Sequence, residues 1–314
     1  MMMFGLATTW AAVLGSIAYG SGDFIGGYVT RRLGTFCTVA IAQSVAVAFM
    51  LQDYALAHNS LPLGTQGSAG LAAGVAYAIG VMSIYEGLGR GRIAIVASIC
   101  GLLSIVVPLA GDLALGRDIT QNEFTGIALC AAAAVLIVGA GADCLDRQPI
   151  GWSVRLGVIS GLGFGIADLG LGSVPPELAA GSLLVTRVVA ATIAVLLALA
   201  MARRISSRTI LTHAPASVVV SPAPSSTGSR PTGVSLGPTV CVALAMTAGL
   251  LDALGHFGYV HAATHGSMGV AAALVAIFPG FTVLLAAIVL GERITRLQLV
   301  GFGLGGGGIV FITV

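Results

Sequence analysis

The chain lacks the charge that keeps a soluble protein in water. Only 8% of its 314 residues are charged, whereas 57% are hydrophobic, and the mean hydropathy is +1.01. Lysine is absent altogether, so all fourteen basic residues are arginine. Soluble domains carry about 25% charged residues. This composition therefore excludes a soluble domain of this length and indicates a membrane protein.

Cysteine is scarce, and its spacing shows no pairing. The five cysteines are Cys37, Cys100, Cys130, Cys144 and Cys241. Four of them fall within apolar runs, so neither a disulfide framework nor a zinc site is indicated. The histidines His256, His261 and His265 are spaced by five and four residues, which does not put all three on one helix face. We therefore predict no metal ion and no other cofactor.

What the sequence does contain is long apolar runs. A bilayer core about 30 Å thick is crossed by about 20 apolar residues in a helix. Ten such runs cover residues 5–28, 35–51, 69–88, 93–115, 124–142, 155–174, 180–202, 238–261, 268–291 and 297–314. They are continuous rather than alternating, and too long for barrel strands. The first has no basic residue before it, so we assign it as a helix rather than a signal peptide. We predict an all-α polytopic membrane protein with ten transmembrane helices.

Arginine is distributed unevenly around these runs. In a ten-helix arrangement twelve arginines fall on one side, only Arg117 falls on the other, and Arg187 lies inside a run. The positive-inside rule identifies the crowded side as cytoplasmic. We predict a multi-pass protein of the inner or plasma membrane with both termini outside the cytoplasm. The connection 203–237 is rich in Pro, Ser, Gly and Thr, and is predicted to be a flexible cytoplasmic linker.

The two halves of the chain repeat one another. An offset of 145 residues aligns Asp23 with Asp168, and nearly the same offset places Gln43 beside Arg187. Later in each half the offset becomes 175, and the linker absorbs the difference. Each copy holds five helices. An odd number of spans inverts the second copy in the membrane, as in many secondary transporters.

We divide the chain accordingly into two repeats. Residues 1–150 hold the first five helices. Residues 151–314 hold the other five and are interrupted by the linker 203–237. The fold class predicted is thus ten transmembrane helices in two inverted five-helix repeats.

The last quarter of the chain resembles a known family. Three runs carry the resemblance, namely Asp252–His256, Ala271–Ala286 and Leu290–Gly301. They are similar to the closing helices of EamA-like carriers, which belong to the drug/metabolite transporter superfamily. The resemblance implies inverted repeats and transport of a small molecule, often its export. The first half departs from the family pattern at Tyr19, where tryptophan is usual, and at Asp118, where the acid of a Gly-Glu-Arg signature is displaced.

Ionisable residues inside the apolar runs are the candidates for function, because a charge in the bilayer is costly. The hairpin turn near residue 177 puts Asp168 and Arg187 at about the same depth, which predicts an ion pair between them. The pair is either a structural bridge or a substrate anchor on Arg187 that Asp168 gates.

Asp23 has no such cation at its depth. The residue opposite it in the first hairpin is Gln43, which can donate a hydrogen bond but cannot neutralise a charge. Burial without a cation favours the protonated carboxyl, as proton coupling requires. The alternative is that Asp23 leans toward the interface and pairs with Arg31 or Arg32.

The eighth run adds two polar residues, Asp252 and His256, which lie four apart and so share one helix face. They are candidates for a proton relay, with a simple packing hydrogen bond as the alternative. Gly20, Gly22 and Gly165, close to the two repeated acids, are predicted to let their helices flex. The glycine-rich tenth run indicates close packing within the bundle, with a homodimer seam as the alternative.

These observations predict a secondary transporter rather than an enzyme. It would move a small amphipathic metabolite or drug by alternating access, with proton coupling and export. Few cations are present to hold phosphates, which argues against nucleotide sugars. The predicted partners are this substrate and the lipid bilayer, with no nucleic acid. Two alternatives stay open: an intramembrane aspartyl protease with Asp23 and Asp168 as its dyad, and a structural or sensory protein that transports nothing.

Overall fold

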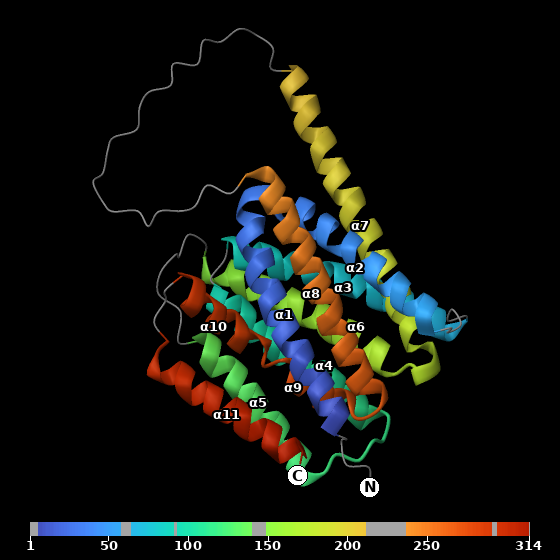
Figure 1. Ribbon diagram of the computed structural model, residues 1–314, viewed down its shortest axis with the longest axis vertical. Coiled ribbons are helices and arrows are strands. Elements are labelled where there is room, and N and C mark those ends of the chain that lie inside the picture. Colours follow the sequence, from blue (N-terminus) through green and yellow to red (C-terminus); the bar gives the residue numbers. More distant parts are fainter. Residues whose placement is uncertain are drawn as a thin grey trace.

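Helices make up the architecture, and they pack as one bundle (Figure 1). The computed structural model describes residues 6–57, 64–90, 93–139, 149–211, 237–290 and 294–313. In chain order the helices are α1 (Leu6–Leu33), α2 (Thr35–Ala57), α3 (Thr65–Arg90), α4 (Ile93–Ala114), α5 (Gln121–Gly139), α6 (Ile150–Gly172), α7 (Pro176–Leu211), α8 (Pro238–Thr264), α9 (Met268–Val275), α10 (Phe278–Leu290) and α11 (Arg296–Thr313). No strand occurs within these described ranges. The predicted all-α fold is confirmed.

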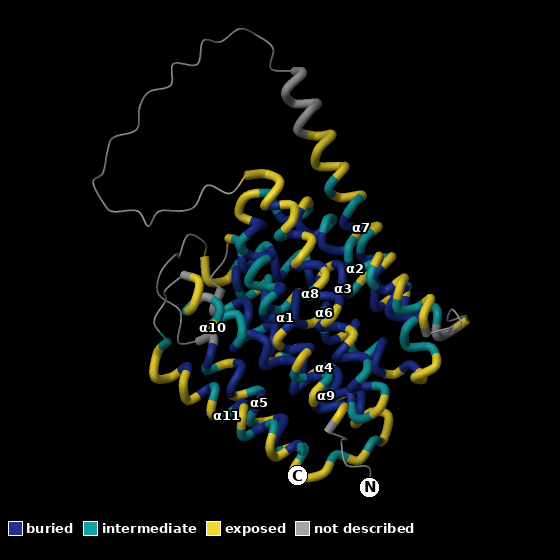
Figure 2. Tube along the Cα trace, viewed as in Figure 1, coloured by how far each residue is buried: buried dark blue, intermediate teal, exposed yellow. Residues whose placement is uncertain are grey.

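The bundle is built for a lipid environment. Within the described ranges, eight helical segments are long and apolar enough to cross a bilayer, and α5 adds a shorter apolar helix. Large apolar side chains cover the outside: Leu14 is 60% exposed and Ile288 is 71% exposed. Figure 2 shows these exposed stretches on the outer faces of the helices, with buried positions gathered inside. Apolar surface on this scale is stable in hydrocarbon and not in water, so the chain is a polytopic membrane protein.

Two predicted boundaries need correction. The second apolar run was expected to end at residue 51, but α2 continues to Ala57. The linker was expected to begin at residue 203, but α7 continues to Leu211 and projects beyond the bundle (Figure 1). Arginine is a good helix former, so the basic residues there extend the helix. Residues 212–236 of the predicted linker lie outside the described ranges.

The ninth predicted run is not one helix but two. α9 ends at Val275 and α10 begins at Phe278, with a turn at residues 276–277. Pro279 accounts for the break: it has no N–H to donate to the carbonyl of Val275, and proline is favoured in the first turn of a helix. The two pieces together occupy the place of one membrane span. The break lies beside the cavity described below.

The start of α9 is fixed by a carboxylate from α4. Asp112 is fully buried and accepts hydrogen bonds from Ser267 Oγ at 2.8 Å and from the backbone N–H of Gly269 at 2.7 Å. Arg117 neutralises it, with Nη1 at 3.2 Å from Asp112 Oδ1. A carboxylate is well placed at the N-terminus of a helix, where backbone donors lack partners. These bonds hold the broken helix in position.

Packing partners are exchanged between the two halves. α1 packs against α8, and its counterpart in the second half, α6, packs against α3. In the same way α2 packs against α8, and its counterpart α7 packs against α3. The pairs α2 with α7 and α5 with α11 join matching helices. This is the pattern that the predicted repeats 1–150 and 151–314 would produce.

Glycine permits the closest helix contacts. A Cβ at Gly20 would lie 2.2 Å from the carbonyl oxygen of Phe278, and one at Gly165 would lie 2.7 Å from Cβ of Val107. At Gly22 it would lie 3.2 Å from the carbonyl oxygen of α8 residue 248. α1 and α6 run unbroken through these three glycines. They permit close packing in this structure, and their role in helix flexing stays a prediction.

The glycines of α11 fall on two faces. One set packs against α5 and consists of Gly301, Gly305 and Gly308, while Gly303, Gly306 and Gly307 would meet no atom within 4 Å if a Cβ were added. Packing within the bundle therefore explains the first set. The homodimer seam stays a prediction.

Candidate functional site

A buried arginine stands at the centre of the bundle. Arg187 of α7 has no exposed surface. Its Nη1 donates to Asp252 Oδ2 at 2.5 Å and to Gln43 Oε1 at 3.0 Å. Its Nη2 donates to the backbone carbonyl of Asp252 at 3.1 Å and lies 2.9 Å from His256 Nδ1. The guanidinium carbon is 4.3 Å from the ring centre of Tyr77. A charge buried this deeply is stable only with such a set of partners.

The carboxylate of Asp252 is the counter-ion of Arg187. Its Oδ2 also accepts from Gln43 Nε2 at 3.0 Å, and its Oδ1 accepts from the hydroxyl of Tyr77. Both oxygens are therefore occupied. The predicted ion pair between Asp168 and Arg187 is wrong, because the cation is already neutralised from α8.

The reason for this error is the packing of consecutive helices. A hairpin turn constrains only the depth of its residues along the membrane and not the direction in which their side chains point. However, α6 packs mainly on α3 and α4, whereas α7 packs mainly on α2 and α3. The two helices have little contact with each other, so equal depth does not bring the side chains together.

The hydrogen bond to Arg187 determines the proton position on His256. Arginine can only donate, so Nδ1 of His256 must accept and the ring proton lies on Nε2. That Nε2 is 3.6 Å from Oδ1 of Asp168, which is too long for a hydrogen bond. A second proton on Nδ1 would direct an N–H donor of His256 at the N–H donor of Arg187 Nη2. His256 is therefore neutral in this arrangement, and a relay between Asp252 and His256 stays a prediction.

A small cavity lies beside this network, and the empty space within it and at its open mouth totals about 490 Å³. Its polar walls are Asp23, Ser104, Asp168 and Asp252, and its aromatic walls are Tyr19, Phe164 and Phe278. The end of α9 and the break after it complete the lining. Helices of both halves of the chain contribute, whereas Arg187 is not part of the wall.

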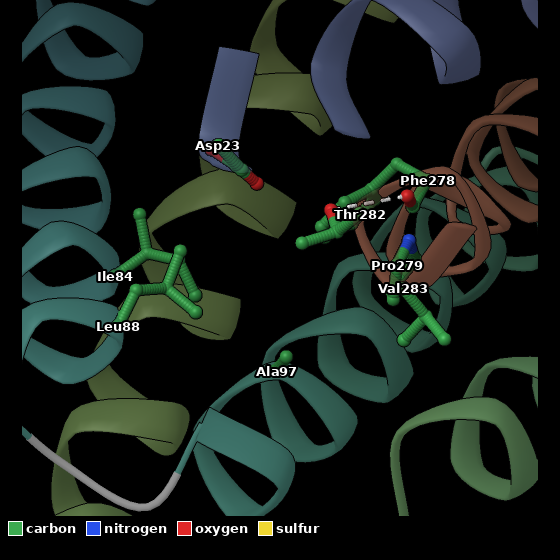
Figure 3. A pocket seen from close by; sticks show the side chains of 8 residues that line it. All are labelled: Asp23, Ile84, Leu88, Ala97, Phe278, Pro279, Thr282 and Val283. Atoms are coloured by element: carbon green, nitrogen blue, oxygen red, sulfur yellow. Dashed lines mark hydrogen bonds between the residues drawn. The ribbon is translucent and has the colours of Figure 1, made fainter. Parts of the chain in front are cut away.

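A second hollow, of about 310 Å³, adjoins the first. Asp23 and Phe278 line both. Figure 3 shows Asp23 directed into the space between Ile84 and Leu88 of α3 on one side and Thr282 of α10 on the other. The hollow therefore extends the cavity toward the ends of α1 and α3 that carry arginine.

Asp23 is the cavity carboxylate without a partner. It forms no hydrogen bond or ion pair with any residue in the described ranges. Gln43, expected at its depth, bonds to Asp252 and Arg187 instead. The alternative pairing of Asp23 with Arg31 is also not found among these residues. Its role in proton coupling stays a prediction.

The aromatic part of the site was not predicted from the sequence, although the sequence contains one signal for it. The offset of 175 that relates the later parts of the halves maps Tyr77 onto Asp252, and these two side chains hydrogen-bond to each other. Gln43 and Arg187, which are 144 residues apart, also bond to each other. Matched positions of the halves thus meet at the centre, and the charged member comes from the second half each time.

The protease alternative requires two carboxylates that share a proton. Asp23 and Asp168 line the same cavity, but no hydrogen bond joins them. Among the described residues the two carboxyl groups are therefore not in direct hydrogen-bond contact.

Comparison with known proteins identifies the family. The model of the EamA-like transporter family matches residues 150–314, which is more than half of the chain. The chain belongs to the EamA-like transporter family. The resemblance seen in the closing helices is thereby confirmed, and the matched region includes Asp168, Arg187, Asp252 and His256 of the site. Membership of a transporter family implies a membrane transporter rather than an enzyme.

The fold of this EamA-like transporter is also found in a solved structure. A crystal structure that carries only the description "Crystal structure of protein" superposes with a TM-score of 0.64, at 14% sequence identity, over 97% of this chain and 98% of that chain. At this identity the likeness shows the fold alone. No functionally curated protein matches the chain.

Proposed function

We propose that this EamA-like transporter moves a small amphipathic molecule by alternating access, in exchange for protons, with net flow out of the cell. The observation that supports the proposal is the cavity between the two halves, which holds a carboxyl group, that of Asp23, with no hydrogen-bond or ion-pair partner among the described residues. A site of this kind, formed where two repeats meet near the middle of the membrane, is typical of secondary transporters.

The proton coupling rests on the difference between the cavity acids. Asp252 is neutralised by Arg187, which does not deprotonate in proteins. Asp23 and Asp168 lack such a cation, and an unpaired charge inside a membrane protein is costly. Each must gain a proton or a cationic group when water is excluded. If a proton and a cationic group of the substrate replace one another at these carboxyl groups, substrate movement is linked to proton movement.

The direction of transport rests on the arginine distribution. The smaller hollow connects Asp23 to Leu88 near the end of α3, which carries Arg90, and to Ala97 near the start of α4. This is the side that the positive-inside rule assigns to the cytoplasm. A molecule entering from the cytoplasm would therefore meet Asp23 first, which supports export.

A reconstituted system tests the proposal without knowledge of the substrate. The purified protein is placed in proteoliposomes loaded with a mixture of metabolites, and the retained solutes are quantified by mass spectrometry with and without a pH gradient. We expect at least one solute to redistribute only when both protein and gradient are present. Identical solute profiles for proteoliposomes and protein-free liposomes would contradict a transport function.

A further inference from the structure

We propose that the cavity selects an organic cation whose charged group is attached to an aromatic or apolar body. This ligand class concerns binding at the cavity. Its importance for transport rests on the proposed function. It follows from the charges, the helix ends and the rings that line the cavity.

The cavity wall is rich in acidic side chains. Three carboxylates line it, those of Asp23, Asp168 and Asp252, and only Asp252 has a cation bonded to it. The histidine nearest to Asp168 is neutral because its Nδ1 accepts from Arg187. Two carboxylates therefore face the cavity without a cation, and a positively charged guest would supply the missing charge.

Among the residues that the structure describes, none offers a free cation to an anionic guest in this site. Arg187 is fully buried and does not line the cavity. Both of its terminal nitrogens are already bonded, to Asp252, Gln43 and His256. Only its Nε has no partner, and that atom is enclosed by protein. The guanidinium of Arg187 is thus held as an internal counter-ion of Asp252 and is not available to a ligand.

The break between α9 and α10 adds acceptors rather than donors. Residues 272, 275 and 276 at the end of α9 line the cavity, and the C-terminal end of a helix carries a partial negative charge. The carbonyl of Val275 loses its i+4 donor because Pro279 has no N–H. On the α10 side, the N–H of Gly280 is already bonded to the carbonyl of Ile277. The polarity of the break therefore also favours a cation.

The aromatic walls favour an amphipathic cation over a metal ion or a simple ammonium ion. Tyr19, Phe164 and Phe278 line the cavity, and aromatic faces attract organic cations while also packing against apolar groups. The same chemistry is realised inside the protein, where the guanidinium of Arg187 lies over the ring of Tyr77. Carboxylates for the charge and rings for the body together define the ligand class.

Three probes of similar shape test the proposal by direct binding. Benzyltrimethylammonium carries a permanent positive charge, phenylacetamide is neutral and phenylacetate is negative. Binding to the full chain in lipid nanodiscs at pH 8 is measured by isothermal titration calorimetry, which requires no transport. We expect the cation to bind at least tenfold more tightly than the other two. Equal binding of all three, or preferred binding of phenylacetate, would overturn the proposal.

Variants locate the binding to the carboxylates. Asp23→Asn and Asp168→Asn should each weaken binding of benzyltrimethylammonium at least tenfold. The matched control is Asp53→Asn, a half-buried acid near the end of α2 that does not line the cavity, and it should bind as wild type does. If one cavity variant fails to fold, as judged by size-exclusion chromatography, the other still decides the question. Unchanged binding by a folded cavity variant would refute the assignment.

The result separates this proposal from the proposed function. Cation binding that depends on Asp23, without any solute movement in proteoliposomes, would support the ligand class and contradict transport. Transport of only neutral or anionic solutes, with no binding of the cation, would support a transporter and overturn the ligand class.

Discussion

Replacement of Asp252 by asparagine should destabilise the protein strongly, because it leaves Arg187 as a buried cation without a counter-ion. Arg187 has no exposed surface, and its ion pair is with Asp252 at 2.5 Å. Removal of one member of a buried pair typically costs about 3–5 kcal/mol. Folded domains are stable by only about 5–15 kcal/mol, so the loss is a large part of the total.

The same change at Asp168 serves as the comparison. Asp168 lies 3.6 Å from a neutral histidine and forms no short ion pair. Asp168→Asn should therefore cost no more than about 1 kcal/mol, the size of an ordinary hydrogen bond. The double variant Asp252→Leu with Arg187→Leu should be more stable than Asp252→Leu alone, since it removes both charges together.

The assay is reversible unfolding in mixed micelles, with the free energy of unfolding determined for wild type and each variant. The double-variant cycle then gives the coupling energy between Arg187 and Asp252. A coupling close to zero, or a greater loss for Asp168→Asn than for Asp252→Asn, would refute the charge assignment made here.

Three further predictions follow from the packing, the helix start and the arginine distribution. Gly20→Val should lower the melting temperature by several degrees because its side chain would meet the backbone of α10. The control Gly303→Val on α11 places its side chain in open space and should leave the melting temperature unchanged. Equal melting temperatures of the two variants would contradict the close contact at Gly20. Asp112→Asn should lower the free energy of unfolding by about 2 kcal/mol, because it weakens the hydrogen bonds that the Asp112 carboxylate accepts at the start of α9. A variant as stable as wild type would show that α9 does not need this carboxylate. The orientation is tested in a variant without native cysteines, into which Glu177→Cys or Arg204→Cys is introduced. A membrane-impermeant maleimide should label Glu177→Cys from outside intact cells and Arg204→Cys only after permeabilisation. The reverse pattern would invert the proposed orientation.

The fold could be predicted from the sequence because its determinants are local. Runs of apolar residues long enough to cross a bilayer require helices, since every backbone polar group must be satisfied within the segment. The break of the ninth run was not predicted, although its cause, Pro279, is also local. A proline in an apolar run does not by itself show where a helix ends: Pro108 lies inside the continuous helix α4.

The candidate site could be predicted only in part, because it is assembled from distant helices. The sequence identified Arg187 and Asp252 as intramembrane charges but not as partners, since their contact depends on which helix faces which. Depth along the membrane can be estimated from hairpin turns, whereas rotation about the helix axis cannot. Tyr77 carries no charge, so the energetic cost of placing a charge inside the membrane did not identify it as a candidate. Only its correspondence with Asp252 under the repeat offset could have indicated it.

The most direct test of the account is the gradient-driven flux through Asp23→Asn proteoliposomes compared with wild type. It uses the solute that redistributes in the metabolite screen, and equal amounts of folded protein. We expect the variant to retain its fold and to lose the pH-gradient-dependent part of the flux, because asparagine cannot exchange a proton. Equal gradient-driven flux by the two proteins between pH 5 and pH 9 would contradict the central role given to Asp23.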